Sequence, residues 1–145
     1  MSSYTATVET KASTDQVLAV LTDPRAIRSW SPVPFDVVGD EDQLHAGSRT
    51  RVSGSLGGLR VGFDVEVHAA DRDGLRLIAE GPVAMDVRYG LRPADSGSEV
   101  SATVSLRNTG GLKAKLIGKA TEAMLAAGAL DNAAGRIARA AEATA

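Results

Sequence analysis

The sequence predicts one α+β domain over residues 1–145, in which a curved antiparallel sheet of about seven strands wraps around a long C-terminal helix. Three observations predict this fold class. One alternating strand and two short helical segments come first, a run of strands separated by turn signals follows, and the C-terminal part then changes to a helical period. A chain of 145 residues readily buries the core of one domain, and it contains no linker or internal repeat.

The N-terminal part predicts a strand and two short helices. Residues 4–10 alternate and are rich in Thr and Val, as is typical of a strand. Ser13 and Gln16 have the spacing of a capping box, so they predict the start of the first helix. Asp23 followed by proline predicts the start of the second helix. This helix is expected to end near Trp30, because the Ser-Pro-Val-Pro sequence after it cannot continue a helix.

The central part of the chain predicts a meander of antiparallel strands. The expected strands are 35–39, 48–56, 59–70, 74–80, 83–92 and 98–107. Hairpin signals separate several of them, namely Gly57-Gly58, Asp73-Gly74 and Ser96-Gly97. Since connections this short join antiparallel neighbours, the strands are expected to pair in chain order.

Apolar and polar residues alternate along three of these strands. In residues 59–67 the odd positions are Leu, Val, Phe, Val and Val, whereas the even positions are Arg, Gly, Asp and Glu. Residues 83–91 and 100–106 follow the same pattern. Such alternation predicts a sheet with one buried face and one face in water.

The C-terminal part predicts a single amphipathic helix of about nine turns. Its apolar residues recur every three or four positions, at Leu112, Leu116, Ala120, Met124, Ala127, Leu130, Ala134, Ile137 and Ala141. Gly118, Gly128 and Gly135 weaken the helix locally and permit a bend or close packing. One helix over the concave face of a curled sheet leaves space between them, and the two short helices would plug one end. The alternative is a fully packed two-layer core.

Composition excludes several classes of function. The net charge of −2 gives no overall attraction to nucleic acid or to an anionic membrane. The chain has no cysteine and two histidines, so disulfides, thiolate catalysis and a metal cluster are not expected, and no cofactor is predicted. The N-terminus lacks signal-peptide features, and no apolar run reaches the ~20 residues that span a bilayer. We expect a cytoplasmic protein that is a monomer or a homodimer.

Several segments carry a resemblance to a known superfamily. They are the helix pair VLAVLTDPRAIRSW, the PVPFDVVG strand, the glycine-rich meander and the C-terminal amphipathic helix. In this order they resemble the START-like/Bet v 1-like (SRPBCC) superfamily, and more narrowly its bacterial polyketide cyclase/dehydrase and lipid-transport group. The resemblance covers nearly the whole chain, and its most specific part is the DPxxIxxW pattern of Asp23, Pro24, Ile27 and Trp30. It implies a helix-grip fold with a deep apolar cavity beneath the long helix, which favours the cavity over the packed core.

The strand pattern and the implied cavity together predict a set of ligand-binding residues. They are Trp30, Phe35, Val52, Phe63, Val65, Leu77, Met85, Val87, Tyr89, Val104, Leu116, Ala120, Met124 and Leu125. Two weak catalytic candidates accompany them. The Tyr89 hydroxyl could orient a carbonyl or hydroxyl group or act as a weak acid, and its alternative is a core tyrosine bonded to the backbone. Arg51 is expected on the outer face, although a bulge near Gly54 would turn it inward and supply a cation.

These features predict the binding of a small hydrophobic ligand, such as a lipid, an isoprenoid or a polyketide, by a carrier or a sensor. One alternative is a cofactor-independent cyclase or dehydratase that acts in the same cavity and needs Tyr89 or Arg51 there. Another is an accessory protein-interaction module, which predicts an exposed apolar patch on the long helix or on the 53–60 turn. The superfamily contains proteins of all three kinds, so the fold alone does not choose among them.

Overall fold

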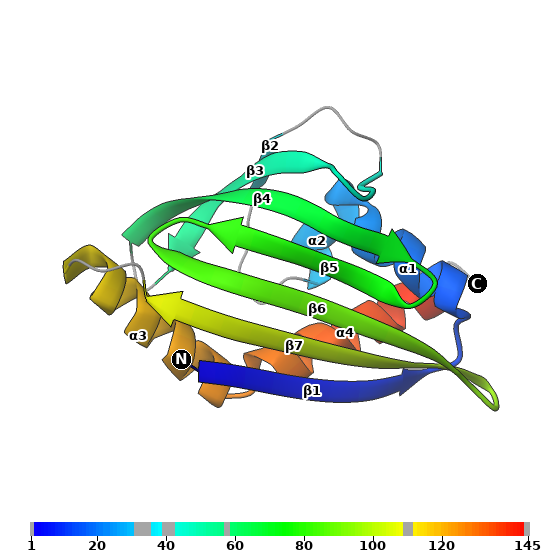
Figure 1. Cartoon of the computed structure of the whole chain (residues 1–145). Helices are drawn as coiled ribbons and strands as arrows, with labels where there is room; N and C mark the ends of the chain where they lie inside the picture. Colours follow the sequence, from blue (N-terminus) through cyan, green and yellow to red (C-terminus); the bar gives the residue numbers. More distant parts are fainter. Residues whose placement is uncertain (1, 31–35, 39–42, 57–58, 109–111, 144–145) are drawn as a thin grey trace.

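The computed structural model describes residues 2–30, 36–38, 43–56, 59–108 and 112–143, which form one antiparallel sheet with helices against one of its faces (Figure 1). The strands are β1 (Ser2–Thr10), β2 (Asp36–Val38), β3 (Arg49–Leu56), β4 (Leu59–Asp71), β5 (Gly74–Glu80), β6 (Val83–Ala94) and β7 (Gly97–Asn108). The helices are α1 (Thr14–Thr22), α2 (Pro24–Trp30), α3 (Leu112–Ala126) and α4 (Ala129–Ala143). The α+β fold class predicted from the sequence is confirmed.

The sheet is an antiparallel meander of β2 to β7, with β1 as the edge strand next to β7. Its seven described strands have the order β1-β7-β6-β5-β4-β3-β2, so each strand from β2 to β6 pairs with the next one along the chain. β1 pairs antiparallel with β7 in an unbroken register. The turn between β4 and β5 depends on Gly74, whose φ is +135°. A Cβ at this position would also collide with the carbonyl oxygen of Tyr89 on β6, so only glycine fits there.

The alternation along the strands divides the sheet into a buried face and an exposed face. On β4, Phe63 and Val67 are each 1% exposed, whereas Asp64 and His68 between and beyond them are open to solvent. Successive side chains of a strand point to opposite faces, so the apolar set lies together on the side that the helices cover. The two-sided sheet predicted from the sequence is confirmed.

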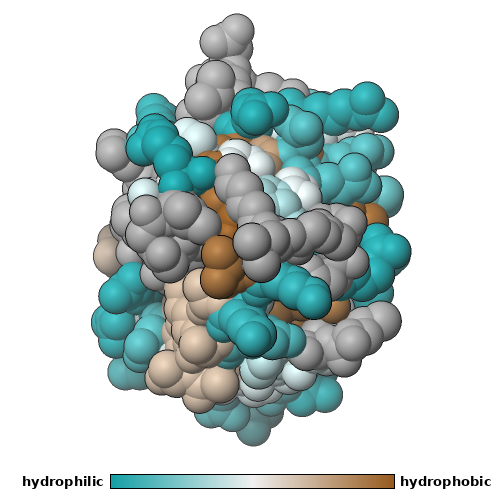
Figure 2. Space-filling model, turned by 90° about the vertical axis from the view of Figure 1, so that its left-hand side faces the viewer, coloured by the Kyte–Doolittle hydropathy of each residue, from teal (hydrophilic) through white to brown (hydrophobic). Residues whose placement is uncertain are grey.

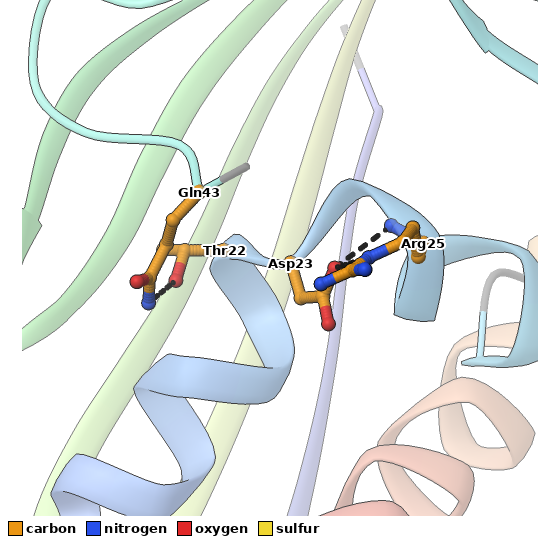
Figure 3. Close-up of polar contacts among 4 residues, drawn as sticks. All are labelled: Thr22, Asp23, Arg25 and Gln43. Atoms are coloured by element: carbon orange, nitrogen blue, oxygen red, sulfur yellow. Dashed lines mark hydrogen bonds and ion pairs between the residues drawn. The ribbon is translucent and has the colours of Figure 1, made fainter. Parts of the chain in front are cut away.

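Both short helices begin at the predicted capping residues. Ser13 Oγ accepts the backbone N–H of Gln16 at 3.2 Å, and Gln16 Oε1 accepts the backbone N–H of Ser13 at 2.7 Å. At the start of α2, Asp23 Oδ1 accepts the backbone N–H of Arg25 at 2.9 Å (Figure 3). These caps fix where α1 and α2 start, and α2 then carries Trp30 into the core at its last residue.

The C-terminal helix is the main departure from the sequence prediction. In place of one continuous helix, the chain forms α3 and α4, separated at Gly128, whose φ of +95° lies in the left-handed region. The Gly128 N–H donates to the carbonyl of Leu125 at 3.2 Å, as is common where a glycine ends a helix. The prediction of a single long helix is therefore wrong, because Gly128 ends the first helix rather than only weakening it.

The interruption also changes which residues α3 buries. On α4 the buried residues include the predicted row of Leu130, Ala134, Ile137 and Ala141. On α3 the buried row runs through Ile117, Thr121 and Leu125, whereas Leu116 is 55% exposed. A row extrapolated from α4 through an unbroken helix misses the buried side of α3 by one residue, because the break at Gly128 frees α3 from the helical phase of α4.

Two apolar clusters fill the space between the sheet and the helices. The larger one joins α1, α2 and α4 to β1, β6 and β7, with Leu21 and Ile137 fully buried in it. The smaller one joins α3 to β4, β5 and β6 around Phe63 and Ile117. Residues of both clusters line the cavity described next. No helix in the described part of the chain is long and apolar enough to cross a membrane.

Candidate functional site

A cavity of about 150 Å³ lies between the sheet and the helices. Its wall comes from α2, the segment before β3, the five strands from β3 to β7, α3 and the start of α4. The lining residues are Ile27, Trp30, Leu44, Thr50, Val52, Phe63, Val65, Leu77, Ala79, Met85, Val87, Tyr89, Val104, Thr121, Met124, Leu125 and Leu130. This wall is almost wholly apolar, and none of these described residues carries a formal charge at neutral pH.

Most of the residues predicted from the sequence to bind a ligand lie in this wall. They are Trp30, Val52, Phe63, Val65, Leu77, Met85, Val87, Tyr89, Val104, Met124 and Leu125. Leu116 and Ala120 are not part of it, because the actual phase of α3 turns Thr121 and its neighbours toward the cavity instead. Phe35 lies outside the described residues. That the wall binds a ligand stays a prediction at this point.

Six lining residues were absent from the sequence prediction. They are Ile27, Leu44, Thr50, Ala79, Thr121 and Leu130. Thr50 and Ala79 share strand parity with Val52 and Leu77, so the alternation itself contained the signal for them. Leu44 lies outside the helices and strands, where no periodicity could indicate its direction.

Leu44 is held against the cavity by the end of α1. Its backbone N–H donates to the carbonyl of Thr22 at 2.7 Å. The neighbouring Gln43 donates through Nε2 to Thr22 Oγ1 at 2.8 Å (Figure 3). The Thr22 hydroxyl donates in turn to the carbonyl of Leu18 at 2.8 Å. These bonds tie the segment before β3 to the α1–α2 junction, and they place the buried Leu44 side chain in the cavity wall.

The aromatic rings of Trp30 and Tyr89 meet in the cavity wall. Their centroids are 5.6 Å apart and their planes lie at 80°, which is the favourable edge-to-face arrangement. Both residues are buried, with exposed fractions of 6% and 5%. Burial raises the pKa of the Tyr89 hydroxyl above its ordinary value, because the phenolate would lose its solvation. Tyr89 is therefore neutral at physiological pH.

Trp30 also carries a polar atom that has no partner among the described residues. Its Nε1 is shielded from solvent, and no hydrogen-bond acceptor within the described part of the protein reaches it. An indole N–H can only donate. Native proteins pair the great majority of buried polar groups, so a buried indole N–H with no acceptor among the described residues is unusual.

Arg51 lies on the outer face of the sheet and does not reach the cavity. Its Nη1 is 3.2 Å from Oδ1 of Asp64, and its side chain is 62% exposed. Along their described lengths β3 and β4 pair in continuous register, so β3 has no bulge at Gly54. The shift in pairing lies in β4 instead, between Val67 and Ala69. The inward orientation considered for Arg51 is therefore wrong.

The surface at the α3 end of the molecule combines hydrophilic and apolar side chains. Figure 2 shows this face, on which a small apolar area lies between hydrophilic groups. Within the described ranges, Leu116 on α3 is the large apolar residue that is strongly exposed, at 55%. Single exposed apolar side chains are common on folded proteins, so Leu116 alone does not define an interaction surface.

A curved antiparallel sheet, closed by helices around an uncharged apolar cavity, defines the chain as a helix-grip protein. Residues 1–142 match the family described as "Polyketide cyclase / dehydrase and lipid transport", and the chain belongs to this family. The resemblance to the SRPBCC superfamily is thereby confirmed. Membership implies a cavity that binds a hydrophobic ligand.

Solved structures share this fold at low sequence identity. TTHA0849 from Thermus thermophilus aligns with a TM-score of 0.73 and 18% identity over 99% of each chain. Ara h 8.0201 aligns with a TM-score of 0.62 and 12% identity over 94% of this chain and 97% of its own. DynU16, from the dynemicin biosynthetic locus, aligns with a TM-score of 0.64 and 23% identity over 98% of this chain but 48% of its own, so this chain spans about half of DynU16. No curated protein matches the sequence.

Proposed function

We propose that this chain binds one small, uncharged, hydrophobic molecule in the cavity, as a carrier or a sensor. The observation that carries the proposal is the chemistry of the wall. Apolar side chains from the sheet and from the helices meet around it, and the described lining contains no carboxylate, amine, guanidinium or imidazole. Lipids, isoprenoids and polyketide-like molecules offer the apolar surface that such a wall accepts.

The volume of the cavity limits the part of the ligand that fits inside. A cavity of about 150 Å³ has the size at which an engineered apolar cavity in another protein binds benzene. We therefore propose a ligand, or a ligand end group, of roughly six to ten non-hydrogen atoms. A larger molecule would require α3 or the segment that carries Leu44 to move outward.

The apolar lining of the cavity also favours an occupant. A ligand that fills the space removes apolar surface of the wall from water. This burial is favourable by roughly 25 cal/mol per Å² of apolar surface, and it supports binding without a charged anchor.

A binding role is better supported than a cyclase or dehydratase activity. General acid–base catalysis is most effective when the pKa of the group lies near the working pH. Burial raises the pKa of Tyr89 instead, so its hydroxyl keeps its proton and can donate a hydrogen bond but cannot serve as a base. With Arg51 on the outer face, the described wall offers Tyr89 no ionisable partner.

The proposal is tested by native mass spectrometry of the protein purified from its own host, followed by organic extraction of any bound molecule. If the protein arrives empty, its thermal unfolding is measured with and without saturating toluene. Occupancy by an uncharged hydrophobe, or a higher unfolding temperature with toluene, is the expected result. A charged bound molecule would contradict the proposal, and so would an empty protein whose unfolding temperature toluene does not change.

Two neighbouring substitutions on β5 give a matched control. Ala79→Leu adds side-chain volume inside the cavity and is expected to reduce occupancy or the effect of toluene. Ile78→Leu changes the adjacent residue, which points to the other face of the sheet, and is expected to change neither. Equal binding by the two variants would show that the ligand lies elsewhere.

A further inference from the structure

We infer that two copies of this chain associate through β1, so that their two sheets join into one sheet across a two-fold axis. The inference goes beyond the proposed function, because β1 supplies none of the described residues of the cavity wall. It starts from the place of β1 in the sheet. β1 is the edge strand at one end, and β7 is its one strand partner in the described part of the chain (Figure 1).

The outer edge of β1 offers backbone groups to another strand. Ser2–Thr10 pairs with β7 in unbroken register, so every second residue of β1 directs its N–H and C=O away from β7. Edge strands of native proteins often carry a lysine, a proline or a bulge that prevents pairing with another chain. The sequence SSYTATVET contains no lysine, proline or glycine, and its pairing with β7 has no bulge. This edge is therefore suited to accept a second strand.

The side chains of β1 retain surface that a neighbouring strand would cover. On the face toward the helices, Tyr4 and Val8 are half-buried. Their cross-strand partners on β7, Val104 and Val100, point to the same face and are buried. β7 has a strand on each side, whereas β1 has a strand on one side. A strand beside β1 would therefore remove apolar surface of Tyr4 and Val8 from water.

A second copy of the chain fits this edge because β1 is complementary to itself. In an antiparallel pair with the two-fold axis at Ala6, Tyr4 lies opposite the partner's Val8, and Thr5 lies opposite the partner's Thr7. Aromatic–β-branched and Thr–Thr pairs are favourable across antiparallel strands. The hydroxyls of Thr5 and Thr103 already form such a pair within one chain, at 3.2 Å. The register also keeps the half-buried apolar residues of both strands on the helix side of the joined sheet.

The charge of β1 is compatible with this self-pairing. Glu9 is the single charged residue of the strand. With the axis at Ala6 it lies opposite the partner's Ser3, so the two Glu9 carboxylates are at opposite ends of the interface. The register uses all nine residues of each strand, and it gives roughly eight to ten hydrogen bonds between the two copies.

The test is analytical ultracentrifugation of the whole chain from micromolar to millimolar protein, and the expected result is a reversible dimer. Thr5→Lys/Thr7→Lys places like charges opposite each other at two positions of the interface, and it is expected to weaken the dimer about tenfold or more. Thr5→Lys/Thr7→Glu places opposite charges at the same two positions. It is expected to return the dissociation constant to within about threefold of that of the unmodified protein.

A matched control makes the same change one strand away from the edge. Ser101 and Thr103 lie on β7 directly beside Thr7 and Thr5, and Ser101→Lys/Thr103→Lys is expected to leave the dimer intact. Circular dichroism checks that each variant folds. Should Thr5→Lys/Thr7→Lys unfold, hydrogen exchange of the unmodified protein decides the question. The amides of β1 should then exchange more slowly at millimolar than at micromolar protein, while those of the β4–β5 turn should not change.

The outcomes separate this edge from other surfaces. A protein that stays monomeric up to millimolar concentration overturns the inference and leaves the edge of β1 to a strand of a different protein. A dimer that Thr5→Lys/Thr7→Lys weakens no more than the β7 variant does forms through another surface, which also overturns it. If the variant with opposite charges fails to restore the dimer, the axis at Ala6 is wrong.

Discussion

The hydroxyl of Thr10, at the end of β1, lies 2.7 Å from a carboxylate oxygen of Glu142 in the last turn of α4. The same hydroxyl lies 3.2 Å from the carbonyl oxygen of Ala138 and accepts the backbone N–H of Ala12, also at 3.2 Å. One buried side chain thus joins the first strand to the last helix, and both elements pack on the larger apolar cluster.

Replacing Thr10 by valine should lower the free energy of unfolding by about 1–3 kcal/mol, because the buried groups that it now pairs lose a partner. Urea denaturation measures this change. Thr7→Val on the same strand is the control, since Thr7 is exposed and its hydroxyl makes only a 3.4 Å contact with Ser101. An equal loss in both variants would contradict the role of Thr10.

Gly74 is expected to tolerate substitution less well than Gly47. Gly74→Ala should cost about 3 kcal/mol or more, since the new Cβ meets the carbonyl of Tyr89 in addition to the unfavourable φ of +135°. Gly47→Ala has a φ of +92° but open space around the added atom, so it should cost about 1 kcal/mol. Thermal unfolding of the two variants checks the order, and the opposite order would mean that the β4–β5 turn adjusts freely.

Removing the guanidinium of Arg51 should leave ligand affinity unchanged. Its ion pair with Asp64 is exposed, and such pairs contribute about 0–1 kcal/mol to stability. Arg51→Ala is therefore expected to bind toluene like the unmodified protein and to unfold at nearly the same urea concentration. A loss of affinity of tenfold or more would mean that Arg51 reaches the ligand after all.

The buried Tyr89 should make the protein lose stability in strong alkali. In the unfolded chain its hydroxyl has the ordinary pKa of 10.0, whereas burial raises the pKa in the folded protein. Below about pH 10 both states keep the proton and the group contributes no pH dependence. Above it the unfolded state binds fewer protons, so the free energy of unfolding falls by up to about 1.4 kcal/mol per pH unit.

Urea denaturation of the unmodified protein, Tyr89→Phe and Tyr4→Phe over this alkaline range measures the effect. Tyr89→Phe should show a shallower decline than the unmodified protein, while Tyr4→Phe should keep the steep one. If all three proteins lose stability in parallel, Tyr89 is not the group whose ionisation opposes folding.

The strands were predictable because their alternation is local. The alternation of apolar and polar residues was enough to assign Phe63 and Val65 to the buried face. The shift in strand pairing comes after Val67, so it does not change the face to which these two side chains point. The place of Leu44 in the cavity wall could not be predicted, because the orientation of its side chain depends on a backbone hydrogen bond to Thr22, which is distant in sequence. Leu116 was assigned inward because a continuous helix was assumed.

The sequence could not predict that the indole N–H of Trp30 has no partner among the described residues. The DPxxIxxW pattern indicated where the tryptophan lies along the chain, but whether its N–H finds an acceptor depends on residues that approach it only in the folded protein. The sequence thus predicted the wall of the cavity in large part, whereas its polar detail required the structure.

Gly128 gives the two halves of the C-terminal segment separate tasks. α4 anchors the fold, since it packs along β1 and α1 through a nearly all-alanine and aliphatic row. α3 supplies Thr121, Met124 and Leu125 to the cavity wall. Because a left-handed glycine separates them, the side chains of α3 can be exchanged, and the helix can tilt to suit them, without forcing α4 out of register. Substitutions on α3 can therefore change the cavity wall while the anchor stays unchanged.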